Sequence, residues 1–354
     1  MKLKQLLFLL IPFLVSCNNG TDFTEDTPVP ENAQAEPTAK TGDTRILRST
    51  ELEKPTATTT LCFENFPIID GSDSTEPLRM LLMCRLLGID CEWVYDNWER
   101  MTWRIWPGTI KFEELSTKFW CYNTHGSFLK LIKGESDIII TARGISRDEI
   151  KTAEAEGVEL LSRPIAKDAF VFIVNSKNPV RSLSVEQIKR IYMGEITNWS
   201  EVGGNDAAIK AYCRDPNSGS QEKMETVVME GLTMPSWAVL PLWSMIAPYK
   251  TLARDVDGIC FTPFYFYDSM VRPNDISLVT LDGVTPEKAT IANGTYPYVT
   301  EVMVSVRADV DRASTAYQLF YQLATGKHNE IIDESGYISI PSGDSSTGIR
   351  PVRR

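Results

Sequence analysis

The chain lacks the features that mark several large classes of protein. Its 36 Lys and Arg residues are outnumbered by 47 Asp and Glu residues, and its formal net charge is −11. Because nucleic-acid binding depends on a basic face, nucleic acid is not an expected partner. With 43% hydrophobic and 23% charged residues, the composition is typical of a globular protein and not of a disordered or membrane-spanning one.

Histidine is scarce, and cysteine is not arranged for metal binding. There are two histidines, and the seven cysteines include no CxxC pair, so no metal site and no cofactor are expected. The chain also has no G-x-S-x-G motif, which disfavours a serine hydrolase built on Ser72, Ser74 or Ser218. Apart from Cys17, six cysteines remain, and their spacing is compatible with disulfides or with free buried thiols.

The N-terminus has the pattern of an export signal. Two lysines precede a short apolar run at Leu6–Val15, which is too short to cross a bilayer. The following Ser16-Cys17 completes a sequence that resembles a bacterial lipobox, although ordinary signal-peptide cleavage is the alternative. We therefore expect residues 1–17 to be a lipoprotein signal peptide, with Cys17 lipidated. This predicts a protein of the bacterial cell envelope, held on its extracytoplasmic side by the lipid anchor alone.

Composition divides the rest of the chain into a tether and an α/β region. Residues 18–59 are rich in Thr, Pro, Glu, Asp and Ala, which predicts a disordered tether. From there on, strand-like apolar runs alternate with amphipathic helical ones. Helices are expected at 75–88, 183–195 and 221–231, and strands at 169–175 and 208–214. Ser184 and Gln187 have the spacing of a capping box.

Three segments share one local pattern, in which a strand is followed by a small-polar turn and then by a helix. They are "GSDSTEPL", "YNTHGSFLKL" and "RDPNSGSQEKM". The first N–H groups of a helix have no intrahelical partners, and hydroxyls and glycines beside them favour an anion site. A single turn of this kind is most often an ordinary helix cap. Three in one chain, one of them headed by an arginine suited to oxyanion contact, indicate a binding cleft.

Longer motifs connect the chain with a known family. The segment 164–231 contains an Asn-Pro-Val turn, the block "EQIKRIYMGEITNWSEVGG" and the loop "RDPNSGSQ". It closely resembles the phosphate-binding, PstS-like family of periplasmic substrate-binding proteins. "IIDGSDSTEPL", "THGSFLKLIKGESDIIITAR" and "IANGTYPYVTEVMVSVR" match the remaining family motifs in the same order. The resemblance extends from about Leu61 to about Val352.

The resemblance implies an α/β, type II periplasmic-binding-protein fold with two lobes, two crossovers and a ligand cleft between the lobes. Lobe 1 would comprise residues 60–166 and 299–354, and lobe 2 residues 167–298. It also implies a monomer that performs no catalysis. Such a protein would capture inorganic phosphate or a similar oxyanion and deliver it to an ABC permease and its ATPase. A sensing module of the same fold, without a transport role, is the alternative.

The same resemblance implies the ligand contacts. The guanidinium of Arg214 would contact the anion, and Ser218, Gly219 and Ser220 would supply hydroxyls and N–H groups. The other implied contacts come from earlier loops and are Asp73, Ser74, Thr75, Thr124 and Thr141. Asp137, a recurrent aspartate in the family, is expected to hold the backbone at the start of a strand.

Three positions depart from the family pattern. Ala142 and Pro216 occupy places where some members carry aspartates, which accept the proton that phosphate has and sulfate lacks. Asp73 stands where a threonine is expected. Because a carboxylate beside a dianion costs free energy unless a proton or cation lies between them, Asp73 or Asp215 would take over the acceptor role, or the ligand is not phosphate.

Two further features leave alternatives open. His125 would either contact the anion, more strongly as the pH falls, or face solvent. Five of the eight tryptophans lie between Trp93 and Trp120. Aromatic packing beneath an irregular segment is favoured for them over a patch that faces a partner or covers the ligand.

Overall fold

The computed structural model describes residues 52–341, except for 98–100, 111, 120–122 and 217. The expected signal peptide, Cys17 and most of the tether lie outside the described residues, as does Cys121. No helix within the described part of the chain is long and apolar enough to cross a membrane.

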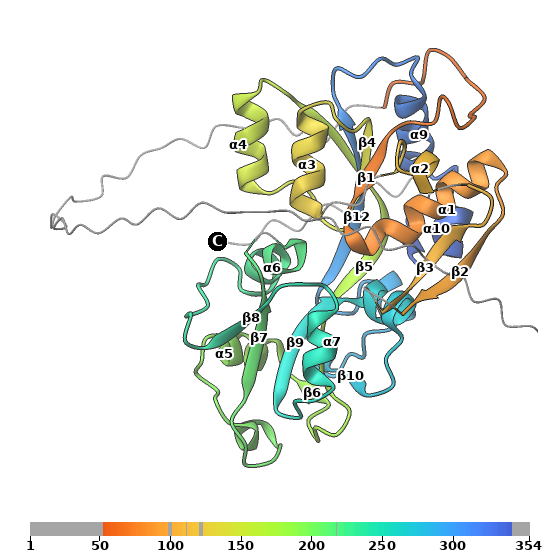
Figure 1. The fold of residues 1–354 in the computed structure, drawn as a ribbon. Helices are drawn as coiled ribbons and strands as arrows, with labels where there is room; N and C mark the ends of the chain where they lie inside the picture. The colour runs from red at the N-terminus through yellow and green to blue at the C-terminus, as the bar shows by residue number, and fades with distance from the viewer. Residues whose placement is uncertain (1–51, 98–100, 111, 120–122, 217, 342–354) are drawn as a thin grey trace, which may run out of the picture. The chain divides into compact units, whose positions relative to one another are not determined.

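A mixed sheet of nine strands organises the fold (Figure 1). Its order is β1-β4-β12-β5-β9-β7-β8, and β10 and β13 also pair with β5. The strands are β1 (Ile69–Gly71), β4 (Ile138–Thr141), β5 (Leu160–Asn175), β7 (Lys210–Arg214), β8 (Val239–Leu242), β9 (Gly258–Pro263), β10 (Ile276–Leu278), β12 (Val299–Arg307) and β13 (Ile338–Ser339). β4 is parallel to β1, and β7 is parallel to both β8 and β9.

β5 is the strand that joins the two halves of the sheet. Its first part pairs antiparallel with β12, from Leu160 opposite Arg307 to Ala169 opposite Val299. Its second part pairs with β9 and β10. From the sequence, a strand was predicted only over residues 169–175, because polar residues between Ser162 and Asp168 interrupt the apolar run before it. Those residues are nevertheless paired, and β5 and β12 lie side by side in Figure 1.

The elements of the first half of the sheet include the helices α1 (Glu76–Leu87), α2 (Phe112–Leu115), α3 (Thr124–Ile132), α4 (Arg147–Ala155), α9 (Thr315–Ala324) and α10 (Asn329–Ser335). The helix expected at 75–88 is confirmed as α1, with Pro77 in its first turn and Gly88 as its C-cap. Asp137 also has its expected role, since its Oδ2 accepts the N–H of Ile68 at 2.7 Å, immediately before β1.

The second half contains α5 (Val185–Tyr192), α6 (Gly219–Lys223), α7 (Ala247–Leu252) and α8 (Lys288–Ala292), with the short pair β6 (Ser182–Leu183) and β11 (Thr280–Leu281). The capping box of Ser184 and Gln187 is present at α5. The helix expected at 221–231 is shorter and starts earlier. α6 begins at Gly219 and continues as one π-helical stretch, η3 (Met224–Val228), in which the Met229 N–H donates to the Met224 carbonyl.

Two large apolar clusters form the core. The smaller is built around Phe170, Phe172, Trp199 and Phe261, all at most 1% exposed. The larger surrounds α1 and the β1–β4 strands, and it also includes Tyr265 and Phe266. Because those aromatic residues belong to the range expected for lobe 2, the larger core draws on both expected lobes, and the boundaries at 166/167 and 298/299 stay predictions.

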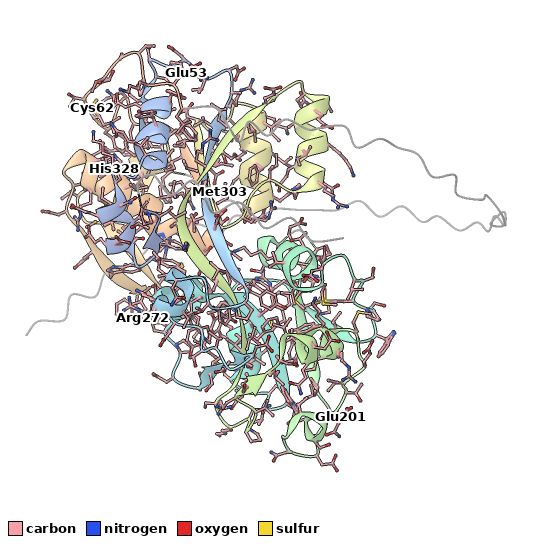
Figure 2. The ribbon with its side chains drawn as sticks, turned by 180° about the vertical axis from the view of Figure 1, so that it is seen from behind. Glu53, Cys62, Glu201, Arg272, Met303 and His328 are labelled. Atoms are coloured by element: carbon pink, nitrogen blue, oxygen red, sulfur yellow. The ribbon has the colours of Figure 1, made fainter. Side chains whose placement is uncertain are left out.

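The tryptophan-rich segment forms a hairpin of its own. β2 (Cys91–Asp96) and β3 (Thr102–Pro107) pair antiparallel, and Arg104 of β3 forms an ion pair with the buried Glu76 of α1. The guanidinium of Arg272, labelled in Figure 2, lies 5.5 Å from the ring centre of Trp93 and 5.0 Å from that of Trp103. These cation–π contacts and the half-buried rings agree with the packing interpretation.

Five cysteines lie among the described residues, and none of the five forms a disulfide. Cys62, Cys84, Cys91, Cys213 and Cys260 are free thiols, three of them buried. Within the described ranges, no group of three His, Cys, Asp or Glu side chains could hold a metal ion.

Candidate functional site

A cleft of about 260 Å³ lies where the ends of β1, β4 and β7 approach one another. Residues 72–74, 123–124 and 142–143 form what we call the first wall, and residues 214–215, 218–220 and 243–245 form the second wall. The described residues that line the cleft are Ser72, Asp73, Ser74, Asn123, Thr124, Ala142, Arg143, Arg214, Asp215, Ser218, Gly219, Ser220, Lys223, Trp243, Ser244, Met245 and Pro263.

The loop after β1 enters the first wall through a sharp turn. A Cβ on Gly71 would lie 1.9 Å from the carbonyl oxygen of Ile140, so only glycine allows β1 this close to β4. The chain then forms the 3₁₀ turn η1 (Asp73–Thr75), which runs directly into α1. Asp73 and Ser74 line the cleft, and the hydroxyl of Tyr337 donates to the Ser74 carbonyl at 3.0 Å.

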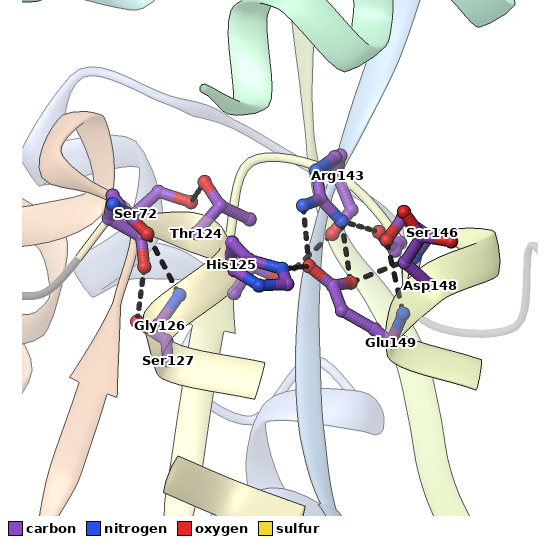
Figure 3. A network of polar contacts seen from close by, with 12 residues as sticks. Ser72, Thr124, His125, Gly126, Ser127, Arg143, Ser146, Asp148 and Glu149 are labelled. Atoms are coloured by element: carbon purple, nitrogen blue, oxygen red, sulfur yellow. Dashed lines mark hydrogen bonds and ion pairs between the residues drawn. The ribbon is translucent and has the colours of Figure 1, made fainter. Parts of the chain in front are cut away.

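The start of α3 supplies the second part of this wall. The side chain of Asn123 caps the helix by accepting the Gly126 N–H at 2.8 Å, which leaves Thr124 at the first helical position. The Thr124 hydroxyl lies 2.7 Å from that of Ser72, which also accepts the Ala142 N–H at 2.9 Å (Figure 3). Ser72 therefore ties together the three loops of the first wall.

Arg214, the last residue of β7, is held from four directions in the second wall. Its N–H donates to the Gln221 side chain at 3.0 Å, and its Nε donates to the Leu242 carbonyl at 3.1 Å. Its Nη1 lies 3.0 Å from the sulfur of Met245, and its Nη2 lies 3.2 Å from Oδ2 of Asp215. The guanidinium is 5% exposed and is therefore fixed before any ligand arrives.

The helix that follows Arg214 is capped by Ser218. Ser218 accepts the Gln221 N–H at 3.1 Å, as a cap does. The side-chain Oε1 of Gln221, however, accepts the N–H of Arg214, while the Ser218 N–H donates to the Asp215 carbonyl. Gln221, in the first turn of α6, thus links the start of this helix to the backbone of Arg214.

The two walls come into close contact at Gly219. A Cβ at this position would lie 2.6 Å from Oγ1 of Thr124 and 3.7 Å from Nε of Arg143. Any side chain at residue 219 would therefore push the walls apart.

Arg143 is a functional candidate that sequence reasoning missed. It lines the cleft directly after β4, and its side chain is 9% exposed. Its Nη groups bind both carboxylate oxygens of the buried Glu149 at 2.7 and 2.8 Å, while its buried Nε has no partner within the described residues. The carboxyl end of a parallel strand is the usual edge for ligand binding, and this was the available signal.

Lys223, also missed, lies at the base of the cleft and is 4% exposed. It stands four residues after Gly219, one helical turn along the same face, so the spacing within α6 could have pointed to it.

Seven of the nine expected contacts line the cleft, and Thr75 and Thr141 do not. The Thr75 hydroxyl is fully buried and lies 2.9 Å from the Ser72 carbonyl and 2.7 Å from that of Ile140. The Thr141 hydroxyl donates to the Arg143 carbonyl at 2.8 Å. Both hydroxyls thus bond to backbone carbonyls, and neither residue is among those that line the cleft.

His125 lies beside the cleft and not among its lining residues. Its Nδ1 is 3.1 Å from Oε1 of Glu149, and Figure 3 shows His125 and Arg143 both directed at this carboxylate. Ala142 and Pro216 stand where some family members carry aspartates. Ala142 lines the cleft, and Pro216 is not among its lining residues. Asp73 and Asp215 both line it, on opposite walls.

A family model described as "PBP superfamily domain" matches residues 123–324, which is more than half of the chain. The chain belongs to the PBP superfamily. The chain is similar to two curated proteins, Protein SphX of Synechococcus elongatus and the phosphate-binding protein PstS of Bacillus subtilis. It is 24% identical to each. The first alignment covers 62% of this chain and 67% of SphX, and the second 58% of this chain and 68% of PstS.

Solved structures agree with this PBP assignment. A protein from Clostridium perfringens, assigned as a phosphate ABC transporter substrate-binding protein and containing bound phosphate, matches with a TM-score of 0.55 at 21% identity. An ABC-type phosphate transport receptor from Vibrio cholerae matches with a TM-score of 0.54 at 21% identity. Each match covers 77% of this chain and 98% of the other. These similarities establish the two-lobed α/β fold.

Because both Nη groups of Arg143 bind the carboxylate of Glu149, removing this carboxylate tests how the first wall is held. We expect Glu149→Gln to lower the free energy of unfolding by about 3 kcal/mol, since a buried guanidinium would lose its counter-charge. Urea unfolding measures this. Asp148→Asn is the matched control, because the Asp148 side chain is 81% exposed, and its effect should stay within about 0.5 kcal/mol. Equal losses in the two variants would contradict the role of Glu149.

Proposed function

We propose that this protein is an extracytoplasmic substrate-binding protein that captures phosphate for import by an ABC transporter. The observation that carries the proposal is the cleft itself. It gathers a fixed arginine, several hydroxyls and the start of a nine-residue helix from loops far apart in the sequence. The PBP superfamily membership and the relatives named as phosphate-binding proteins support the same ligand.

The donors in the cleft suit a tetrahedral anion. Arg214 would donate to the anion from the second wall, together with Ser218, Gly219 and Ser220. From the first wall, the Thr124 hydroxyl and the free N–H groups at the start of α3 would donate to the opposite oxygens. Because these groups are already positioned by other contacts, little conformational entropy would be lost on binding.

The carboxylates in the cleft would select phosphate over sulfate. Asp73 on the first wall and Asp215 on the second would each be able to accept a hydrogen bond from the O–H group that a phosphate dianion carries. Sulfate has no such proton, and a bare carboxylate would repel it. Asp215 also lies beside Arg214, whose positive charge offsets the repulsion between this carboxylate and the ligand.

The N-terminal segment would place the protein at the cell membrane. Residues 1–17 would direct export, Cys17 would carry the lipid, and residues 18–59 would tether the binding unit to the membrane. Lobes comprising residues 60–166 with 299–354, and residues 167–298, would close over the anion as a monomer. The closed form would then dock on the permease, whose ATPase drives transport, and the protein would perform no catalysis itself.

Titration of the purified full-length protein by calorimetry tests the ligand. We expect phosphate to bind and sulfate to bind much more weakly. Arg214→Ala should weaken phosphate binding at least about a hundredfold, because it removes charge-assisted hydrogen bonds. Arg254 is an exposed residue just after α7 and serves as the control. The variant Arg254→Ala should bind phosphate as the wild-type protein does. If the wild-type protein bound none of phosphate, arsenate, sulfate and molybdate, the proposed function would be wrong.

Gly219→Ala tests whether both walls hold the anion. The added Cβ would meet the Thr124 hydroxyl and keep the walls apart, so we expect phosphate affinity to fall about tenfold or more while the melting temperature stays close to that of the wild type. Gly144→Ala is the matched control, because nothing lies within 4 Å of a Cβ there. Unchanged affinity in Gly219→Ala would mean that the two walls do not bind the anion together.

A further inference from the structure

The Lys223 side chain places a positive charge in the interior, at the base of the cleft. The residue ends α6, is 4% exposed and lines the cleft. Its Nζ donates one hydrogen bond, to Oγ1 of Thr300 at 3.1 Å. An ammonium has three donors, so two of them have no protein acceptor among the described residues. A buried charge with so few hydrogen bonds is costly unless something else supplies acceptors.

The nearest carboxylate balances this charge only in part. Asp168 of β5 is the register partner of Thr300 of β12 and attracts Lys223 electrostatically. Its Oδ1 accepts the N–H groups of Ala169 and Tyr265 at 2.8 and 2.9 Å, and its buried Oδ2 has no partner in the described part of the chain. Asp168 therefore does not take up the idle donors of Lys223 through a hydrogen bond.

Burial outweighs the attraction within this pair. It lowers the pKa of Lys223 to about 8, with Arg143 contributing in the same direction and Asp168 opposing it. It also raises the pKa of Asp168, with Lys223 opposing the shift. The other charged groups around the cleft and this pair are Asp73, Glu149, Arg214, Asp215 and Asp268.

We infer that Lys223 is a further cationic ligand, whose ammonium donates a hydrogen bond to one oxygen of a doubly charged tetrahedral oxyanion in the cleft. The inference rests on the proposed function and adds a group that reaches the anion from the base, between the two walls. A dianion would satisfy the idle donors and supply the missing negative charge. The site would then hold a dianion more tightly than a monoanion of the same shape.

A bound dianion would change the protonation of the Lys223 ammonium. In the free protein, Lys223 loses its proton as the pH rises through about 8. An anion beside the ammonium favours its charged form and raises its pKa. Binding at about pH 8.5 should therefore take up a proton, and phosphate affinity should fall as the pH rises further. Phosphate is already a dianion in this range, so its own titration does not cause the decrease.

The test is calorimetric titration of the full-length protein with phosphate at about pH 8.5, in two buffers of different ionisation enthalpy. We expect the wild-type protein to take up a fraction of a proton on binding. Lys223→Met should bind roughly ten- to hundredfold more weakly and take up no proton. Lys250→Met, which removes an exposed lysine of α7, should behave like the wild type.

Lys223→Gln provides a second variant if the methionine disturbs the fold, because it keeps a neutral donor for Thr300. It too should lose the proton uptake. Unchanged affinity in both variants, or proton uptake that persists in them, would overturn the inference while leaving phosphate binding intact. Absence of phosphate binding by the wild-type protein would instead overturn the proposed function.

Discussion

The antiparallel pairing of β5 with β12 is the constraint on which the rest of the structure depends. β5 continues beyond this pairing to β9 and β10, so one strand carries both halves of the sheet. The cleft loops that follow β1, β4, β7 and β8 start from strands whose positions follow from β5 through β12 and β4 or through β9 and β7. The ends of β1, β4 and β7 can face one another only because this continuous strand sets their places.

The cleft combines its charges in pairs. Arg214 lies beside Asp215, Arg143 beside Glu149, and Lys223 near Asp168. Each carboxylate offsets part of the cost of burying a cation, and Asp215 and Glu149 also hold their arginines in place through hydrogen bonds. A site built in this way keeps donors fixed without a large excess of positive charge, which agrees with the acidic composition of the whole chain. Hydrogen bonds directed at the anion, and not net charge, would then account for specificity.

Local patterns predicted the elements that depend on neighbouring residues. The helix at 75–88 and the capping box at Ser184 could be recognised because propensity and capping act within a few residues. The three segments with a small-polar turn before a helix also contained the seven expected contacts that line the cleft, since helix starts tend to gather at one edge of such a sheet.

What the sequence could not reveal depends on contacts between distant segments. Thr75 and Thr141 have the right residue type, but their hydroxyls turn to backbone carbonyls, and no periodicity reports that choice. Arg143 and Lys223 acquire their roles from Glu149, Thr300 and Asp168, which lie on other elements. The polar first part of β5 is paired because β12 covers it, although its alternation of residues does not suggest a strand.

The most direct test of the central claim is a crystal structure with arsenate, a tetrahedral analogue of phosphate whose arsenic atom is located by anomalous scattering. We expect one strong peak in the cleft, within hydrogen-bonding distance of Arg214 on the second wall and of Thr124 on the first. A peak outside the cleft, or one that contacts a single wall in a closed protein, would contradict the view that both walls bind the anion together.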